Sequence, residues 1–145
     1  MIYTNLTKQA LKLCFAAHKE QVDKCGIPYV VHPFYLAQQM TTEYETVVAL
    51  LHDVVEDTPY TLEDLRAMGY PEEVVEAVGL LTHDDDRPYL EYVAALKHNP
   101  LARAVKLADL KHNSDVTRLD SPADLNPERA QRYRQARAML EAELD

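Results

Sequence analysis

The sequence predicts an all-α protein, and three observations support that prediction. Apolar residues recur at spacings of three and four through most of the 145-residue chain, as they do along one face of a helix. No stretch of useful length alternates apolar and polar residues as a half-buried strand does. Asn-Pro pairs, which favour helix starts, occur at Asn99-Pro100 and Asn126-Pro127. We therefore expect one compact domain over residues 1–145, with about eight helices.

The first two helices are expected on either side of a loop. Leu6–His18 carries one sheltered apolar stripe, and Gly26 prevents its continuation. Pro33 favours an extended conformation at His32 and offers a first residue for a helix over Phe34–Met40. His32 would then project from the start of that helix, which is a suitable place for a ligand.

The third helix, expected over Thr46–Glu56, is the one around which the chain is organised. Its apolar residues fall on all sides of a helical wheel, which is typical of a buried helix. His52, Asp53, Glu56 and Asp57 nevertheless lie in or next to it, and burying charge is costly unless the charge is paired or bound to a cation. On a continuous helix, His52 shares a face with Glu56 and Asp53 with Asp57. We interpret this polar cluster as the core of a metal-dependent active site.

Five further helices complete the expected fold. Thr61–Asp64 is typical of a capped helix start, and Glu72–Thr82 is amphipathic. A short helix is expected over Tyr89–Leu96, a longer one from Leu101 to about Leu119, and a last one after Asn126-Pro127.

Composition excludes several classes of protein. A formal net charge of -9 argues against a nucleic-acid partner, because such proteins need a basic surface. No apolar run approaches membrane-spanning length. Cys14 and Cys25 are too few for a disulfide framework and have no metal-ligand spacing, so we expect a cytoplasmic protein.

Four residues are the candidate metal ligands. Asp109, like Asp53, is an acid within an apolar helix, and His32 and His52 would complete a site of two imidazoles and two carboxylates. Such mixed nitrogen and oxygen donors suit Mn²⁺, Fe²⁺, Co²⁺ or Zn²⁺ better than Mg²⁺. A metal held there lowers the pKa of its bound water and offsets charge on a phosphoryl group.

Other side chains are expected to handle protons or bind substrate. Glu56 and Asp57 can exchange a proton with the attacking water or the leaving oxygen. Asn113 and Lys106 flank Asp109 at helical spacing and can reach a substrate. Other interpretations stay open: the two acids can simply end a helix, and Lys106 can be a solvated surface residue. His18, His83, His98 and His112 are interpreted as hydrogen-bonded core residues.

The order of these residues resembles the HD superfamily of metal-dependent phosphohydrolases. The closer resemblance is to the hydrolase domain of RelA/SpoT-type proteins and to the small alarmone hydrolases. It is carried by three blocks, Ala17–Pro33, Ala49–Thr58 and Val105–Asn113, which keep their order along the chain.

The resemblance implies a helical hydrolase that removes pyrophosphate from the 3′ position of guanosine tetra- or pentaphosphate. It implies one Mn²⁺ bound by the four candidate ligands, catalysis by Glu56 and Asp57, and substrate binding by Asn113. Lys24 matches a lysine of the family and is expected to contact substrate. Long members have an Arg where this chain has Asp23, and Cys25 replaces a small polar residue, so the match supports hydrolysis more strongly than guanine recognition.

Our first hypothesis is therefore a cytoplasmic, Mn²⁺-dependent phosphohydrolase acting on a small nucleotide, with guanosine 3′-diphosphate compounds as leading candidates. One alternative is an HD phosphatase that acts on another nucleotide or a phosphorylated cofactor. The other is a non-catalytic nucleotide sensor that binds a partner through its acidic surface.

Overall fold

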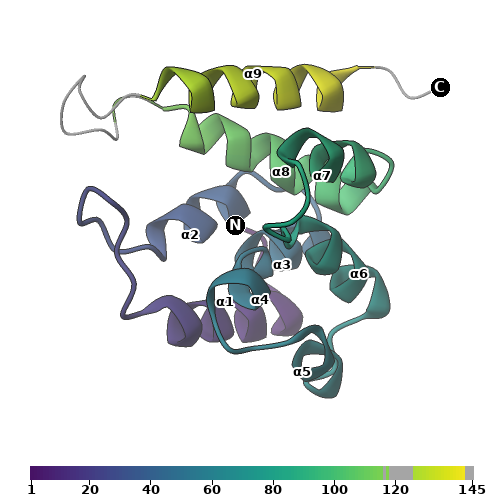
Figure 1. Ribbon diagram of the computed structural model, residues 1–145. Coiled ribbons are helices and arrows are strands. Elements are labelled where there is room, and N and C mark those ends of the chain that lie inside the picture. The colour runs from purple at the N-terminus through teal and green to yellow at the C-terminus, as the bar shows by residue number, and fades with distance from the viewer. Residues whose placement is uncertain (116, 118–125, 143–145) are drawn as a thin grey trace.

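The computed structural model describes residues 1–115, 117 and 126–142, and these residues form helices and no strand. An isolated bridge joins Val22 to Pro28 in the loop after the first helix. The prediction of an all-α fold is confirmed, whereas the single domain over residues 1–145 stays a prediction. The helices, shown in Figure 1, are α1 (Asn5–His18), α2 (Val31–Gln38), α3 (Glu43–Leu51), α4 (Val54–Asp57), α5 (Leu62–Ala67), α6 (Glu72–Leu81), α7 (Tyr89–Leu96), α8 (Pro100–Asn113) and α9 (Pro127–Glu141).

Helix α3 lies at the centre of the fold. Every residue from Thr46 to Leu51 is fully buried, so the helix is covered on all sides. It packs against α1, α2, α6 and α8, while α9 packs against α7 and α8 along one side of the molecule (Figure 1). The expectation of a buried central helix is confirmed, and this helix carries His52 at its carboxyl end.

Side-chain caps start the helices where the sequence indicated. Asn99 and Asn126 each accept a hydrogen bond from a backbone N–H one turn into their helices, and a proline follows each of them. Thr61 and Asp64 form the expected reciprocal capping box. These contacts satisfy backbone donors that a helix start leaves unpaired.

The continuous helix expected over Thr46–Glu56 is wrong, because the chain breaks at His52 and Asp53. His52 caps α3, and Asp53 leaves helical geometry with φ -108° and ψ 1° before α4 begins. The His52 ring nitrogen Nδ1 lies 2.6 Å from the carbonyl oxygen of Ala49. In a continuous helix that carbonyl would accept the Asp53 N–H, so the side chain competes with the backbone for it.

The start of α2 also differs from the prediction. His32 is helical rather than extended, because α2 begins at Val31 and Pro33 lies within its first turn. The N–H groups of Val31 and His32 bond the carbonyls of Pro28 and Tyr29, so helical winding starts before the proline. Pro33 is tolerated there because first-turn N–H groups need no partner within the helix.

Helix α8 is shorter at its carboxyl end than expected. It ends at Asn113, so the predicted extension is wrong over the next two residues, and Leu119 lies outside the described residues.

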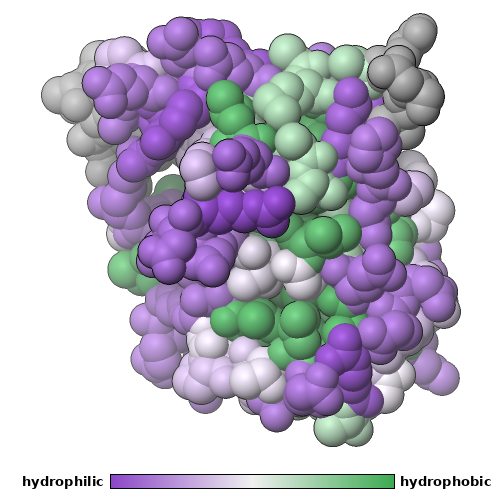
Figure 2. All heavy atoms as spheres, turned by 45° about the vertical axis from the view of Figure 1, so that its right-hand side comes forward, coloured by the Kyte–Doolittle hydropathy of each residue, from purple (hydrophilic) through white to green (hydrophobic). Residues whose placement is uncertain are grey.

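Figure 2 shows one face of the molecule, on which apolar side chains gather in the middle among polar ones. Among the described residues, no helix is both long and apolar enough to cross a membrane.

The burial of α3 predicts the cost of truncating it. Leu50→Ala removes a fully buried side chain and leaves a cavity, so we expect a loss of about 2–5 kcal/mol in the free energy of unfolding. Met68→Ala, at a side chain that is 38% exposed, is the matched control and should cost less than about 1 kcal/mol. Urea unfolding followed by circular dichroism measures both, and equal losses would contradict the central position of α3.

Candidate active site

One cavity of about 440 Å³ brings together every site residue predicted from the sequence. Its walls come from the loop before α2, from α2, from the α3–α4 junction, and from α7, α8 and α9. The predicted residues among its lining are Lys24, His32, His52, Asp53, Glu56, Asp57, Lys106, Asp109 and Asn113. Segments far apart in the sequence therefore meet at one hollow, although the role of each residue stays a prediction.

Three of the four candidate ligands converge on one point. Ligand atoms of His32, His52 and Asp109 all lie within 4.8 Å of one another, and all three residues are buried. His32 Nε2 is 2.8 Å from Asp109 Oδ1, and His52 Nε2 is 3.7 Å from the same oxygen. The first turn of α2, the end of α3 and the middle of α8 supply these side chains.

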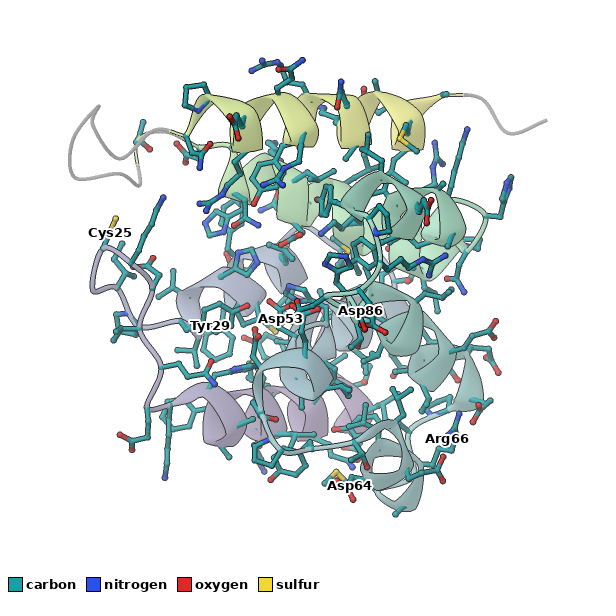
Figure 3. All side chains as sticks on the ribbon, in the orientation of Figure 1. Cys25, Tyr29, Asp53, Asp64, Arg66 and Asp86 are labelled. Carbon is teal, nitrogen blue, oxygen red and sulfur yellow. The ribbon has the colours of Figure 1, made fainter. Side chains whose placement is uncertain are left out.

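Asp53 stands beside this group and belongs also to a second one. Its Oδ2 is 3.0 Å from His52 Nε2, and its carboxylate lies within 4.8 Å of those of Glu56 and Asp57. The Tyr29 hydroxyl donates a hydrogen bond to the same oxygen, and Figure 3 shows the two side chains close together near the centre of the molecule. The break after α3 produces this arrangement, so the predicted pairing of His52 with Glu56 along one helix face is wrong.

The His52 ring indicates that a cation fits here. Its Nδ1 faces the Ala49 carbonyl, which only accepts, so Nδ1 carries the proton of the neutral ring. Nε2 then presents a lone pair toward carboxylate oxygens of Asp53 and Asp109, and it makes no hydrogen bond in the structure. Buried acceptors that face one another are unfavourable without a proton or a metal between them. The donor set therefore fits a divalent transition metal.

A buried ion pair fixes the charge of Asp109. Lys106 Nζ donates to Asp109 Oδ2 at 2.8 Å, and both residues are buried. Burial alone would raise the pKa of Asp109, but Lys106 and the hydrogen bond from His32 hold that pKa well below its usual range. Burial opposes the charge of Lys106, yet Asp109 and the neighbouring tyrosines keep its pKa well above the ordinary value. The interpretation of Lys106 as a solvated surface residue is wrong.

The other three acids of the site have raised pKa values, in contrast to Asp109. Burial, followed by the nearby charge of Asp109, raises the pKa of Asp53 well above its ordinary value. Burial also raises the pKa of Glu56 and of Asp57. Glu56 Oε1 accepts the backbone N–H of His83 at 2.6 Å, which fixes one of its oxygens. Helix α4 spans four residues, so the two acids lie in its first turn and also end it, as one interpretation of the sequence allowed.

The remaining predicted residues lie at the edge of the cavity. Asn113 Nδ2 donates to Asp109 Oδ1 at 3.1 Å, so this residue supports the buried acid as well as lining the hollow. Lys24 comes from the loop before α2, near the loop end where Figure 3 shows Cys25. Asp23 Oδ1 accepts the N–H groups of Cys25 and Ile27, so its carboxylate closes the turn of that loop.

Sequence reasoning missed several residues of the site. His112, interpreted as an ordinary core residue, lies with Nδ1 2.7 Å from His32 Nδ1 and stacks between His32 and Tyr35. Its position three residues after Asp109 was a signal, because that spacing shares a helix face. Arg129 and Tyr133 of α9 also line the cavity, one turn apart, and no motif distinguished them. His83 lines the cavity as well, and His98 is exposed, so the core interpretation of both is wrong.

Comparison with known proteins identifies relatives of this chain. No family model matches the chain. The chain is 36% identical to the guanosine-3′,5′-bis(diphosphate) 3′-pyrophosphohydrolase MESH1 of Mus musculus, over 82% of this chain and 74% of that protein. It is 33% identical to the bifunctional (p)ppGpp synthase/hydrolase SpoT of Escherichia coli over 73% of this chain, but it covers only 17% of SpoT.

A solved structure is similar over almost the whole chain. It is that of a metazoan ortholog of SpoT that hydrolyses ppGpp, with a TM-score of 0.73 and 25% sequence identity. The match covers 97% of this chain and 85% of that one. Together with the cavity described above, these similarities show that the chain belongs to the SpoT and MESH1 family of HD-type hydrolase domains.

Proposed function

We propose that the protein is a Mn²⁺-dependent phosphohydrolase that removes pyrophosphate from the 3′ position of guanosine tetra- or pentaphosphate. The observation that carries this proposal is the convergence of His32, His52 and Asp109 within 4.8 Å, beside a second group of three acids in the same cavity. The activities for which MESH1 of Mus musculus and SpoT of Escherichia coli are named support the same reaction.

The proposed metal ligands are His32, His52, Asp53 and Asp109. Two imidazoles and two carboxylates suit Mn²⁺, and other divalent transition metals fit the same donors. When bound, the metal supplies a water of lowered pKa and offsets charge on the phosphoryl group under attack. Lys106 and Asn113 hold both oxygens of Asp109, so the direction of that ligand is set by the protein.

Glu56 and Asp57 are proposed to move the protons of the reaction. Their raised pKa values bring them closer to neutral pH, where a carboxylate takes up and releases a proton most effectively. One acid accepts a proton from the attacking water, and the other holds that water or delivers a proton to the leaving 3′ oxygen. The hydrogen bond from His83 to Glu56 keeps one oxygen of Glu56 in a fixed position.

Lys24, Lys106 and Asn113 are the proposed substrate contacts. Lys24 enters the cavity from the loop before α2 and offers positive charge to a phosphate. Lys106 has three N–H donors and uses one on Asp109, so the others can reach a phosphate oxygen. The Asp23 carboxylate accepts hydrogen bonds from two backbone N–H groups, and these bonds stabilise its negative charge within the loop.

We propose that the substrate is a small molecule and that the protein acts in a reducing cytoplasm. The net charge of -9 disfavours nucleic acid as a partner, and both cysteines are free thiols. A second candidate function is hydrolysis of another small phosphorylated nucleotide or cofactor. Asp23 in the cavity wall favours this second function, because an acid at that position cannot pack on a guanine base as a cationic side chain could.

A nucleotide panel tests the proposed reaction. Purified protein with Mn²⁺ should release pyrophosphate from guanosine tetraphosphate and leave the guanosine 5′-diphosphate, as measured by ion-exchange chromatography. Release of single phosphates, or faster hydrolysis of other nucleotides, would favour the second candidate function. Nucleotide binding without any product would favour a sensor.

Substitution of the two acids should lower turnover without displacing the metal. Because each is proposed to carry a proton, Glu56→Gln and Asp57→Asn should lower kcat by about 10²–10⁴-fold with little change in KM. Asp84→Asn, in an exposed loop, is the matched control and should leave kcat unchanged. A loss of manganese content in either acid variant, measured by mass spectrometry, would contradict this division of roles.

Removal of the metal should abolish the activity reversibly. Dialysis against EDTA should lower the rate about 100-fold or more, and added Mn²⁺ should restore it, because attack on a phosphate ester at neutral pH needs an activated water. Asp109→Asn should retain little manganese after purification, since it removes a ligand charge and leaves Lys106 without its partner. Full activity after chelation would exclude the proposed mechanism.

A further inference from the structure

A buried histidine behind the cavity is connected to the site by two routes. His18, at the end of α1, is only 1% exposed and does not line the cavity. Its sequence position indicated an ordinary core residue, and its burial agrees with that interpretation. Its contacts, however, lead to Asp57 on one side and to Asp53 on the other.

The first route is a chain of hydrogen bonds whose directions are fixed. Gln21 Nε2 donates to the backbone carbonyl of Asp57 at 3.1 Å, because a carbonyl only accepts. The other end of that amide, Oε1, therefore faces His18 and accepts from its Nδ1 at 2.8 Å. His18 must carry its proton on Nδ1, and the chain ties the end of α4 to α1.

The second route passes through an aromatic contact. The rings of His18 and Tyr29 are 4.9 Å apart between centroids and tilted by 55°. The Tyr29 hydroxyl donates to Asp53 Oδ2, so the face of His18 limits where that hydroxyl can lie. The ring thus supports the tyrosine that orients one candidate metal ligand.

The protein retains this histidine at a cost. With the proton on Nδ1, Nε2 is a buried acceptor, and it has no hydrogen-bond partner in the structure. Burial lowers the pKa of His18, so the ring does not gain a second proton easily. A buried polar atom without a partner destabilises the fold, and an apolar side chain would avoid that cost. The contacts made by Nδ1 and by the ring face therefore explain the residue better than stability does.

We propose that His18 is a positioning residue which, through Gln21 and Tyr29, holds Asp57 and Asp53 toward the cavity. Neither acid is touched by His18 through a direct hydrogen bond in the structure, and each is reached through one intermediate side chain. The proposal rests on the proposed function for its effect on turnover, whereas its effect on the geometry of α4 is independent of any substrate.

Two replacements of His18 separate the proposed role from simple packing. His18→Asn places an amide nitrogen close to the position of Nδ1 and keeps the donor to Gln21. His18→Gln places its amide near the position of Nε2 and loses that donor. Both remove the imidazole ring and insert a neutral amide of similar polarity, so they form a matched pair.

The two variants should differ in kcat and not in KM. His18→Gln should lower kcat by about 10–100-fold, as loss of a residue that orients a site commonly does. The decrease in log kcat caused by His18→Asn should be less than half of that caused by His18→Gln. Equal losses in the two variants, or a greater loss in His18→Asn, would overturn the hydrogen-bonded route.

Amide hydrogen exchange tests the same proposal without any substrate. Exchange in α4 should become about tenfold faster in His18→Gln than in His18→Asn, because Gln21, which donates to the Asp57 carbonyl, is then no longer held by a donor at position 18. Exchange in α6 should not differ between the two. If α4 exchanges equally in both variants, the proposal fails, even if the wild-type protein hydrolyses the nucleotide. If the wild type shows no hydrolysis but the exchange rates differ as expected, the proposed function fails and the positioning role stands.

The intermediate residue provides a second test that leaves His18 in place. Gln21→Met keeps the length of the side chain, removes both hydrogen bonds, and should lower kcat and accelerate exchange in α4 as His18→Gln does. Gln135→Met, at an exposed position of α9, is its control and should change neither quantity. Wild-type behaviour of Gln21→Met would overturn the proposal.

Discussion

The buried carboxylate of Asp109 is the constraint on which the arrangement of the site depends. An isolated charge at this depth would cost several kcal/mol, so every polar group near it has a defined place. Lys106 and Asn113 come from the same helix, one turn on either side, whereas His32 reaches Asp109 from α2. Helix α8 thus provides the acid and two of its partners on one face, and α2 and α3 pack against that helix.

The interruption between α3 and α4 is the second requirement of the site. A straight helix would place Asp53 and Asp57 on one face and His52 with Glu56 on the next. The break at Asp53 instead gathers Asp53, Glu56 and Asp57 into one group and leaves His52 directed toward Asp109. Burial raises the pKa of each of the three acids, and for Asp53 and Glu56 the charge of a neighbouring acid adds to that rise, so a cation or a proton is needed to offset the charge. Structure that is locally unfavourable is therefore concentrated where the chemistry is proposed.

These two features mark the limits of prediction from the sequence. Burial of α3 followed from the apolar periodicity, and the helix starts at Asn99 and Asn126 followed from capping chemistry, because both signals are local. The candidate ligands were found because acids in apolar segments conflict with their surroundings. The break at His52 was missed, since it depends on a side-chain bond to the Ala49 carbonyl that the apolar pattern does not reveal. Arg129 and Tyr133 were missed because α9 is placed by tertiary packing alone.

His112 and His18 show how a buried histidine differs from an ordinary core residue once its partners are known. Each uses Nδ1 on a specific group, His32 in one case and Gln21 in the other, and each ring also contacts a tyrosine, Tyr35 or Tyr29. A purely packing role would be met better by leucine, which has no polar atoms to satisfy. The two histidines thus support the site from different helices, His112 in the cavity wall on α8 and His18 behind the cavity on α1. Ligands that are held in place before a metal binds lose little conformational entropy when it binds. The rigidity of the surrounding side chains therefore increases the affinity of the site for the metal.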